Sequence, residues 1–203
     1  MTFLQPNEYD ISYFDGKLGS YKHNAGYTVY QRWFRINNDF VPYDQSTGEY
    51  WKDLALRFKL DYSLQNKKVL EIGSAKGYIV QAMRELGINA YGIDVSQYAF
   101  DCADKEVKPY LRVADIRTAL SEYSSNEFAY LFSRNTLCCF IDEEIIAMII
   151  QMNRIAVQQV HWIMETGNNQ YYNLKRIQIL IDQFSWKKGT IFTKNNLGQI
   201  YKK

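Results

Sequence analysis

From Lys67 onward, short apolar runs of strand length alternate along the chain with longer stretches of helical periodicity. This alternation is typical of repeated strand–helix units, whose strands form a largely parallel sheet. A final strand at residues 199–203 is expected to be antiparallel, because turn-forming residues precede it at 195–198. The other expected strands span residues 68–72, 89–95, 111–116, 128–133, 157–165 and 189–193.

Helical periodicity fills the intervals between these strands and predicts helices on both faces of the sheet. The third expected helix begins with Asp142, Glu143 and Glu144, where the helix dipole favours negative charge. The pattern therefore predicts a doubly wound α/β fold with a seven-stranded, mostly parallel sheet whose last strand is antiparallel. The expected helices span residues 78–86, 97–106, 142–155 and 171–184.

The first 60 residues are richer in aromatic side chains than the rest of the chain, with 14 of the 32 Phe, Trp and Tyr residues. Within this segment, residues 46–49 read Ser-Thr-Gly-Glu and fit a helix capping box. Trp51, Leu54 and Phe58 then recur at helical spacing, so a helix is expected to pack on the sheet just before the first strand. The segment therefore predicts an aromatic-rich, helical N-terminal cap.

The length of 203 residues suits one compact domain with one ligand cleft. We expect residues 1–62 to form the cap or lid segment and residues 63–203 to form the main ligand-binding part. A net charge of +2 with scattered Lys and Arg disfavours nucleic acid as a partner but does not exclude it. The sequence indicates no oligomeric state.

Three cysteines without a C-x-x-C pair favour reduced thiols and a cytoplasmic location. The sequence has no apolar run long enough to cross a bilayer, so no membrane partner is expected. Its His, Cys and Asp residues do not show metal-ligand spacing, so no metal site is expected.

The most specific motif, at residues 69–77, is an apolar strand that ends in Glu-x-Gly-x-x-x-Gly and opens a helix. Gly73 permits a sharp turn and leaves the backbone open to a ligand, and Gly77 allows close entry into the helix. An ordinary strand-to-helix turn and a dinucleotide site are the alternatives. The wider Gly-x-x-x-Gly spacing favours a different nucleoside over a dinucleotide.

Acidic residues follow each of the next two strands. Asp94 suits the ribose hydroxyls of a nucleoside, and Asp115 suits an adenine amino group. Because the carboxyl ends of parallel strands meet at one edge of a sheet, these two residues and Glu71 are expected to line one crevice. Taken singly, Asp94 could instead support a helix start before Ser96, and Asp115 could form a turn.

On these motifs, residues 67–203 resemble the class I S-adenosylmethionine-dependent methyltransferases, which have a Rossmann-like fold. The resemblance implies S-adenosylmethionine as the cofactor and methyl transfer as the reaction. In such enzymes the glycine loop holds the methionine part of the cofactor, and the two acids hold ribose and adenine. The residues that the resemblance assigns to the cofactor are Glu71, Gly73, Ser74, Ala75, Gly77, Asp94, Val95, Asp115, Ile116 and Ser133.

The acceptor is less well defined. Many relatives that methylate small molecules carry Glu-His shortly after the fourth strand, where residues 135–140 here read Asn-Thr-Leu-Cys-Cys-Phe. A base is needed only if the acceptor must lose a proton, so this departure weakens the case for a hydroxyl acceptor more than for a carboxylate.

We expect a small-molecule or sugar-like acceptor. A non-catalytic S-adenosylmethionine-binding subunit or sensor, and a protein or RNA methyltransferase, stay open. Acceptor-side candidates without an assigned catalytic role are Arg134, Asn135, Tyr27 and His23.

Overall fold

The computed structural model describes residues 34–36, 39–41, 48–134, 136–162, 187–188 and 198–202. Its main sheet contains β3 (Lys68–Ile72), β4 (Asn89–Asp94), β5 (Leu111–Val113), β6 (Phe128–Arg134), β7 (Ala156–Trp162), β8 (Lys187–Lys188) and β9 (Gly198–Lys202).

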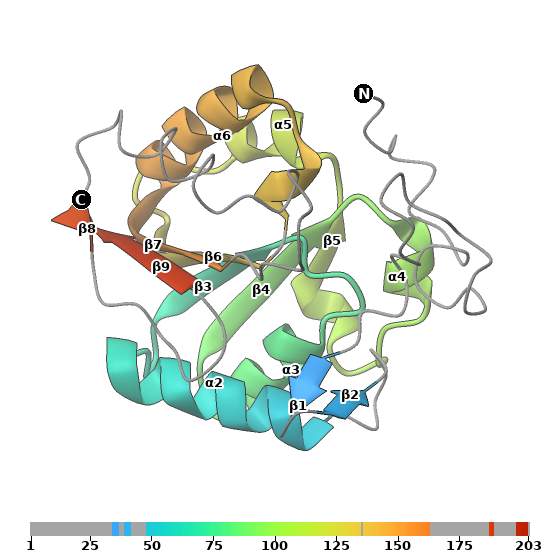
Figure 1. The fold of residues 1–203 in the computed structure, drawn as a ribbon. Helices are drawn as coiled ribbons and strands as arrows, with labels where there is room; N and C mark the ends of the chain where they lie inside the picture. Colours follow the sequence, from blue (N-terminus) through green and yellow to red (C-terminus); the bar gives the residue numbers. More distant parts are fainter. Residues whose placement is uncertain are drawn as a thin grey trace.

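Five strands of this sheet are parallel and stand in the order β5-β4-β3-β6-β7 (Figure 1). Beyond β7, strand β9 runs antiparallel to it, and β8 pairs antiparallel with β9. The parallel α/β sheet predicted from the alternation of strands and helices is therefore confirmed. The strand expected at residues 189–193 lies outside the described residues, and the pairing next to it is made by Lys187–Lys188.

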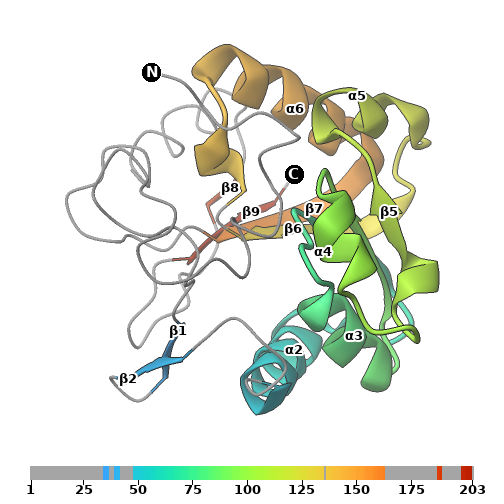
Figure 2. The same cartoon turned by 90° about the vertical axis from the view of Figure 1, so that its right-hand side faces the viewer.

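Helices cover both faces of the sheet, as the two views at right angles show (Figures 1 and 2). On one face lie α2 (Gly48–Tyr62) and α3 (Tyr78–Glu85), and on the other lie α5 (Ile116–Ala119) and α6 (Asp142–Ile155). The doubly wound arrangement is thus confirmed. The shorter helices are α4 (Gln97–Asp101) and the 3-10 turns η3 (Lys108–Tyr110), η4 (Leu120–Glu122) and η5 (Leu137–Cys139).

The central strand β3 is apolar along most of its length because both of its faces are covered. Val69 packs into the layer formed with α2 and α3, while Leu70 and Ile72 pack into the layer formed with α5 and α6. Successive side chains of a strand point to opposite faces, so neighbouring residues serve different layers. This strand therefore anchors both layers directly beneath the glycine turn that follows it.

Helix α2 is part of the first of these layers. Trp51 and Phe58 are buried, and the Phe58 ring meets that of Phe132 on β6 edge-on, with 4.8 Å between centroids. The predicted packing of this helix on the sheet is confirmed. Residues 46 and 47 of the predicted capping box, and the aromatic segment 1–33, lie outside the described residues.

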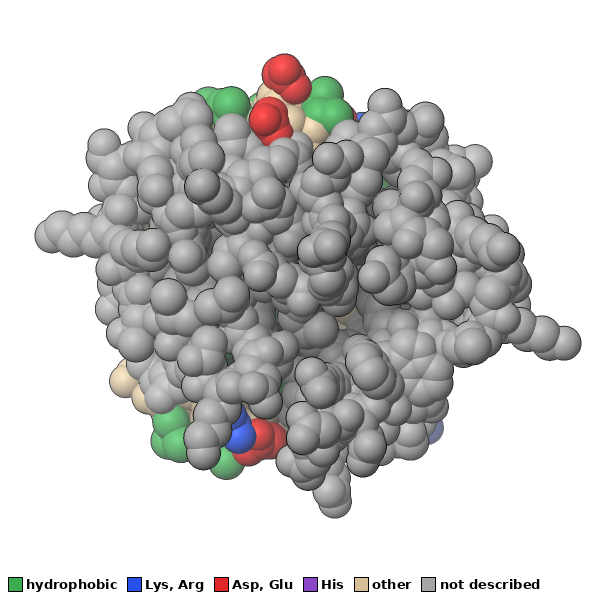
Figure 3. All heavy atoms as spheres, in the orientation of Figure 1, with side chains coloured by type: hydrophobic (Ala, Val, Ile, Leu, Met, Phe, Trp, Pro, Cys, Tyr) green, Lys and Arg blue, Asp and Glu red, His purple; other side chains and the backbone are tan. Residues whose placement is uncertain are grey.

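Helix α6 covers the other face with a regular apolar stripe. Its opposite side reaches solvent, and in the space-filling view acidic and hydrophobic side chains gather at the upper edge, where α6 lies (Figure 3). Among the described helices, none combines the length and the apolar character that a bilayer span requires. The buried stripe of α6 consists of Ile145, Met148, Ile149, Met152 and Ile155.

A small hairpin was not predicted from the sequence. It pairs β1 (Phe34–Ile36) with β2 (Asp39–Val41) in antiparallel register. Two asparagines, Asn37 and Asn38, separate the strands in the sequence. Since Asn is favoured in two-residue hairpin connections, this pair was the available signal.

Strand β5 is shorter than predicted. It ends at Val113, whereas the apolar pattern suggested strand to residue 116. Asp115 is instead the N-cap of α5, and its side chain accepts a hydrogen bond from the Arg117 backbone amide. The capping side chain satisfies a backbone donor at the helix start, which favours the helix over further strand.

Candidate functional site

The glycine turn after β3 is held against the end of β4. The backbone amides of Gly73 and Ser74 both donate to the carbonyl oxygen of Ile93, at 2.8 and 3.2 Å. Gly73 and Gly77 each have φ of +75°, a region in which residues with a side chain are strained. The sharp turn predicted for these glycines is confirmed.

Neighbouring side chains occupy the space that a Cβ atom would need at these glycines. A Cβ on Gly73 would lie 2.1 Å from Thr136 Oγ1, and one on Gly77 would lie 2.8 Å from Leu111 Cδ1. On β4, a Cβ at Gly92 would lie 2.6 Å from the Ser74 side chain. The missing side chain of Gly73 therefore makes room for Thr136, where the sequence suggested room for a ligand.

Thr136 fastens the segment after β6 to the end of β3. Its hydroxyl donates to the Ile72 carbonyl oxygen at 3.0 Å, next to the glycine turn. Thr136 follows directly after Arg134 and Asn135, two of the predicted acceptor-side residues. Sequence reasoning missed this residue, and its place beside those candidates was the only signal.

Asp94, at the end of β4, is bonded to the glycine turn through its carboxylate. Oδ2 accepts from the Ala75 amide at 2.7 Å, and Oδ1 accepts from the Ser96 amide at 2.9 Å. Both oxygens are thus oriented by main-chain donors on two different loops. The N-cap of α4 is Ser96 itself, whose hydroxyl accepts from Ala99, so Asp94 supports the helix start without capping it.

Other polar residues of the predicted site are buried at the ends of the central strands. Glu71 on β3 is 5% exposed and lies in register with Gly92 of β4 and Phe132 of β6. Ser133 on β6 is 2% exposed and lies in register with Ile72. Burying polar side chains is costly, so their position at the carboxyl ends of the strands is typical of a functional edge.

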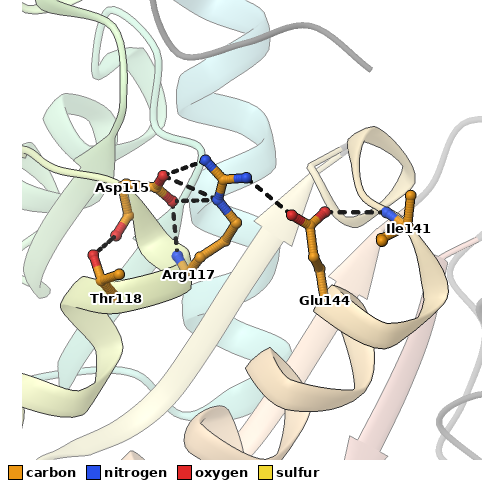
Figure 4. A network of polar contacts seen from close by, with 5 residues as sticks. All are labelled: Asp115, Arg117, Thr118, Ile141 and Glu144. Atoms are coloured by element: carbon orange, nitrogen blue, oxygen red, sulfur yellow. Dashed lines mark hydrogen bonds and ion pairs between the residues drawn. The ribbon is translucent and has the colours of Figure 1, made fainter. Parts of the chain in front are cut away.

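Asp115 follows the end of β5 close to the end of β4, because the amide of the preceding residue, Ala114, donates to the Asp94 carbonyl oxygen at 2.8 Å. Its carboxylate is held by Arg117 (Figure 4). The Arg117 backbone amide reaches Oδ1 at 2.9 Å, Nε lies 3.0 Å from both oxygens, and Nη2 lies 2.5 Å from Oδ2. The side-chain hydrogen bonds from Arg117 lower the pKa of Asp115, and they outweigh the opposing effect of burial.

The same guanidinium joins α5 to the start of α6. Arg117 Nη1 donates to Glu144 Oε1 at 2.9 Å, and Glu144 Oε2 accepts from the Ile141 amide at 3.2 Å (Figure 4). Bonds from Asp115 first, and from Glu144 second, raise the pKa of Arg117 above its ordinary value. Asp115 and Arg117 therefore both stay ionised at neutral pH.

The remaining predicted residues are placed less directly. Ile116 is the first residue of α5 and is 5% exposed within the layer beneath α6, while Val95 is half-buried after β4. Arg134 ends β6 in register with Trp162 of β7. The candidates Asn135, Tyr27 and His23 lie outside the described residues.

The strand order, the glycine turn after β3 and the carboxylate at the end of β4 define a Rossmann-like α/β domain. Residues 70–160 match the family model described as a methyltransferase domain. Over this segment the chain is similar to a methyltransferase domain, and the expected resemblance to S-adenosylmethionine-dependent methyltransferases is confirmed. S-adenosylmethionine is the methyl donor of this class of domain, as expected for the cofactor.

Solved structures share this fold at low sequence identity. Magnesium protoporphyrin IX methyltransferase from Synechocystis PCC 6803, with bound S-adenosylmethionine, is 14% identical, with a TM-score of 0.58 over 76% of this chain and 77% of that one. A SAM-dependent methyltransferase from Archaeoglobus fulgidus is 10% identical, with a TM-score of 0.57 over 75% and 94%. The PH0226 protein from Pyrococcus horikoshii OT3 is 13% identical, with a TM-score of 0.62 over 78% and 91%. No curated protein sequence matches the chain significantly.

Proposed function

We propose that the chain is a methyltransferase that moves a methyl group from S-adenosylmethionine to a small-molecule or sugar-like acceptor. The observation that carries this proposal is the Asp94 carboxylate, which is bonded at 2.7 Å to the Ala75 amide of the glycine turn. This bond joins the two parts of a nucleoside site that lie on separate strands. A carboxylate fixed in this way is pre-oriented for a ligand and does not have to be ordered by it.

The described residues fit the chemistry of the cofactor. The oriented Asp94 carboxylate suits the two ribose hydroxyls, the ionised Asp115 suits an adenine amino group, and the loop from Gly73 to Gly77 would hold the methionine part. Glu71 and the backbone at Ser133 complete the set that we assign to the cofactor.

S-adenosylmethionine supplies a methyl group already activated on a sulfonium. The chain then needs to bind the two reactants, align them and exclude water, which can supply much of the catalysis of such a transfer. The tight packing of Thr136 against Gly73 supports such alignment, because it fixes the start of the acceptor-side segment relative to the cofactor loop.

Two observations favour a small acceptor that a side chain need not deprotonate. The segment at residues 135–140 lacks the Glu-His pair, so a carboxylate is favoured over a hydroxyl. One structural neighbour is named as a methyltransferase of magnesium protoporphyrin IX, which is a small molecule. The division into a cap, residues 1–62, and a main part, residues 63–203, stays a prediction.

The test is the formation of S-adenosylhomocysteine, measured by mass spectrometry, with panels of carboxylic acids, phenols and sugars. Total RNA and denatured protein serve as macromolecular acceptors, and Asp94→Ala is the matched variant that should bind the cofactor more weakly. Product with any of these small acceptors supports the proposal, and a carboxylic acid is the favoured one. Product with RNA or protein alone would overturn the acceptor class. Cofactor binding without product from any acceptor would favour the non-catalytic subunit or sensor.

A further inference from the structure

We propose that Arg117 is a positioning residue that makes the site specific for adenine, by fixing the Asp115 carboxylate and leaving it one acceptor position for the amino group of the base. This inference rests on the proposed function, because it concerns the base of the same cofactor. It assigns a task to a side chain that none of the sequence motifs includes.

Asp115 has a limited number of acceptor positions. An ionised carboxylate offers about four lone-pair positions. Arg117 brings three donors to this carboxylate, namely the backbone amide on Oδ1, Nη2 on Oδ2, and Nε between the two oxygens. Because the Nε–H is shared between the two oxygens, three N–H donors meet about four positions, and a single further N–H donor would satisfy the group.

The Arg117 guanidinium is held in a fixed position by two carboxylates. A solvent-exposed ion pair contributes little, since both side chains lose freedom in forming it. Here the Arg117 guanidinium forms ion pairs with two carboxylates, those of Asp115 and Glu144. Glu144 also accepts a hydrogen bond from the Ile141 amide at the start of α6. The side chains of Arg117, Asp115 and Glu144 are only 36%, 28% and 29% exposed. The network therefore holds Asp115 from both α5 and α6.

The charge state of Asp115 decides which group of a base it can bind. An ionised carboxylate can only accept hydrogen bonds, and the guanidinium lowers the pKa of Asp115, so the group stays ionised at neutral pH. Adenine presents a donor, its 6-amino group, to such an acceptor. Hypoxanthine presents a 6-oxo acceptor instead. Its oxygen would face an Asp115 carboxylate oxygen with no hydrogen between the two atoms to form a hydrogen bond. A site that hydrogen-bonds a ligand group discriminates against an analogue that leaves its polar group unpaired.

The test compares two ligands that differ at this one position, S-adenosylhomocysteine and S-inosylhomocysteine, by calorimetric titration. The wild type is expected to favour the adenine compound by about tenfold or more. Arg117→Ala should bring that ratio close to one. Arg117→Lys should fall between the two, since a lysine cannot form the two-pronged contact. Glu144→Gln leaves Asp115 and Arg117 in place and should lower the ratio in part.

The matched control is Arg112→Ala. Arg112 pairs with Glu122 through Nη2 at 2.5 Å on the strand that precedes α5, and it takes no part in the proposed contact. Its removal should leave the ratio unchanged. A purely structural role for Arg117 would lower the midpoint of thermal unfolding without changing the preference between the ligands, so both quantities are measured for each variant.

The outcomes separate the inference from the function on which it rests. If the wild type binds neither compound, the proposed function fails and the inference fails with it. If the wild type binds both equally, or if folded Arg117→Ala keeps the full preference, the proposed function stands and the role of Arg117 is refuted. Should Arg117→Ala not fold, unchanged ratios in Arg117→Lys and Glu144→Gln would refute it equally.

Discussion

Asp94 ends β4 and Asp115 follows the end of the neighbouring strand β5, yet different kinds of donor orient the two carboxylates. Asp94 accepts from the main-chain amides of Ala75 and Ser96, whereas Asp115 is held chiefly by the Arg117 side chain. A main-chain donor moves only when its loop moves, while a side-chain donor can be removed by one substitution. The placement of Asp94 is thus built into the glycine turn, and that of Asp115 can be changed separately.

The surroundings of the two groups differ in the same way. Around the glycine turn, a Cβ at Gly73 or Gly92 would come within 2.6 Å of a neighbouring side chain. The packing there therefore leaves no space for an added methyl group. Arg117 and Glu144 are about one-third exposed and form a polar network near the surface. Substitutions on the Asp94 side should therefore have larger effects than those on the Asp115 side.

The largest effect is expected at the glycine turn itself. Gly73→Ala should lower the free energy of unfolding by about 3 kcal/mol, from a left-handed backbone and from overpacking against Thr136. Gly87→Ala is the matched control, since φ is +76° there but the nearest atom is the end of the flexible Gln65 side chain, at 3.0 Å. It should cost only about 1 kcal/mol. Equal losses in urea denaturation would contradict the tight packing at Gly73.

Loss of the Asp94 carboxylate should weaken S-adenosylhomocysteine binding about ten- to a hundredfold, because charge-assisted hydrogen bonds to the ribose would be lost. Calorimetric titration of Asp94→Ala measures this effect. Asp104→Ala is the control, since Asp104 makes the same kind of bond to the amide two residues on, at 2.8 Å, but lies away from the strand ends. A folded Asp94→Ala variant with unchanged affinity would remove Asp94 from the site.

Thr136→Val keeps the shape of the side chain and removes its hydroxyl. It should cost about 1 kcal/mol of unfolding free energy, the usual value of one such hydrogen bond, and it should speed amide exchange at Gly73 and Ser74. Thr136→Ser keeps the donor and should restore slow exchange. Ser121→Ala removes a comparable hydroxyl-to-carbonyl bond in an exposed helix and should leave both amides unchanged. Identical exchange in the wild type and Thr136→Val would show that the hydroxyl does not hold the turn.

The smallest effect concerns pH and the Asp115 side. The folded-state pKa of Asp115 is lowered, so its pairing with Arg117 stabilises the fold above the unfolded-state pKa of about 4 and is lost as the pH falls through the lower, folded-state value. Arg117→Ala should therefore be less stable than the wild type by at most about 1 kcal/mol at pH 7. Urea denaturation at pH 7, 5 and 3 should show this difference shrinking at the lowest pH. A difference that stayed constant would mean that Arg117 acts through packing alone.

The sequence predicted the features that depend on local pattern. The parallel strands appear as apolar runs because both faces of the sheet are covered, and the glycine turn appears because Gly73 and Gly77 need a positive φ. The start of α5 also depends on local sequence. Asp115 caps this helix, and the cap favours the helix over a longer strand β5.

Contacts between distant segments could not be predicted in this way. The bond from Thr136 to Ile72 spans 64 positions, and that from Arg117 to Glu144 spans 27. Threonine and arginine fit many exposed positions, so neither residue stood out before the topology brought its partner close. For the same reason the sequence suggested a ligand above Gly73, where the fold places Thr136.

The most direct test of the account is calorimetric titration of the purified chain with S-adenosylmethionine and S-adenosylhomocysteine, with NAD as the comparison ligand. We predict that both sulfur nucleosides bind with one-to-one stoichiometry and that NAD does not. Absence of binding by either sulfur nucleoside, or binding of NAD in their place, would contradict the proposed cofactor site at Asp94 and the glycine turn.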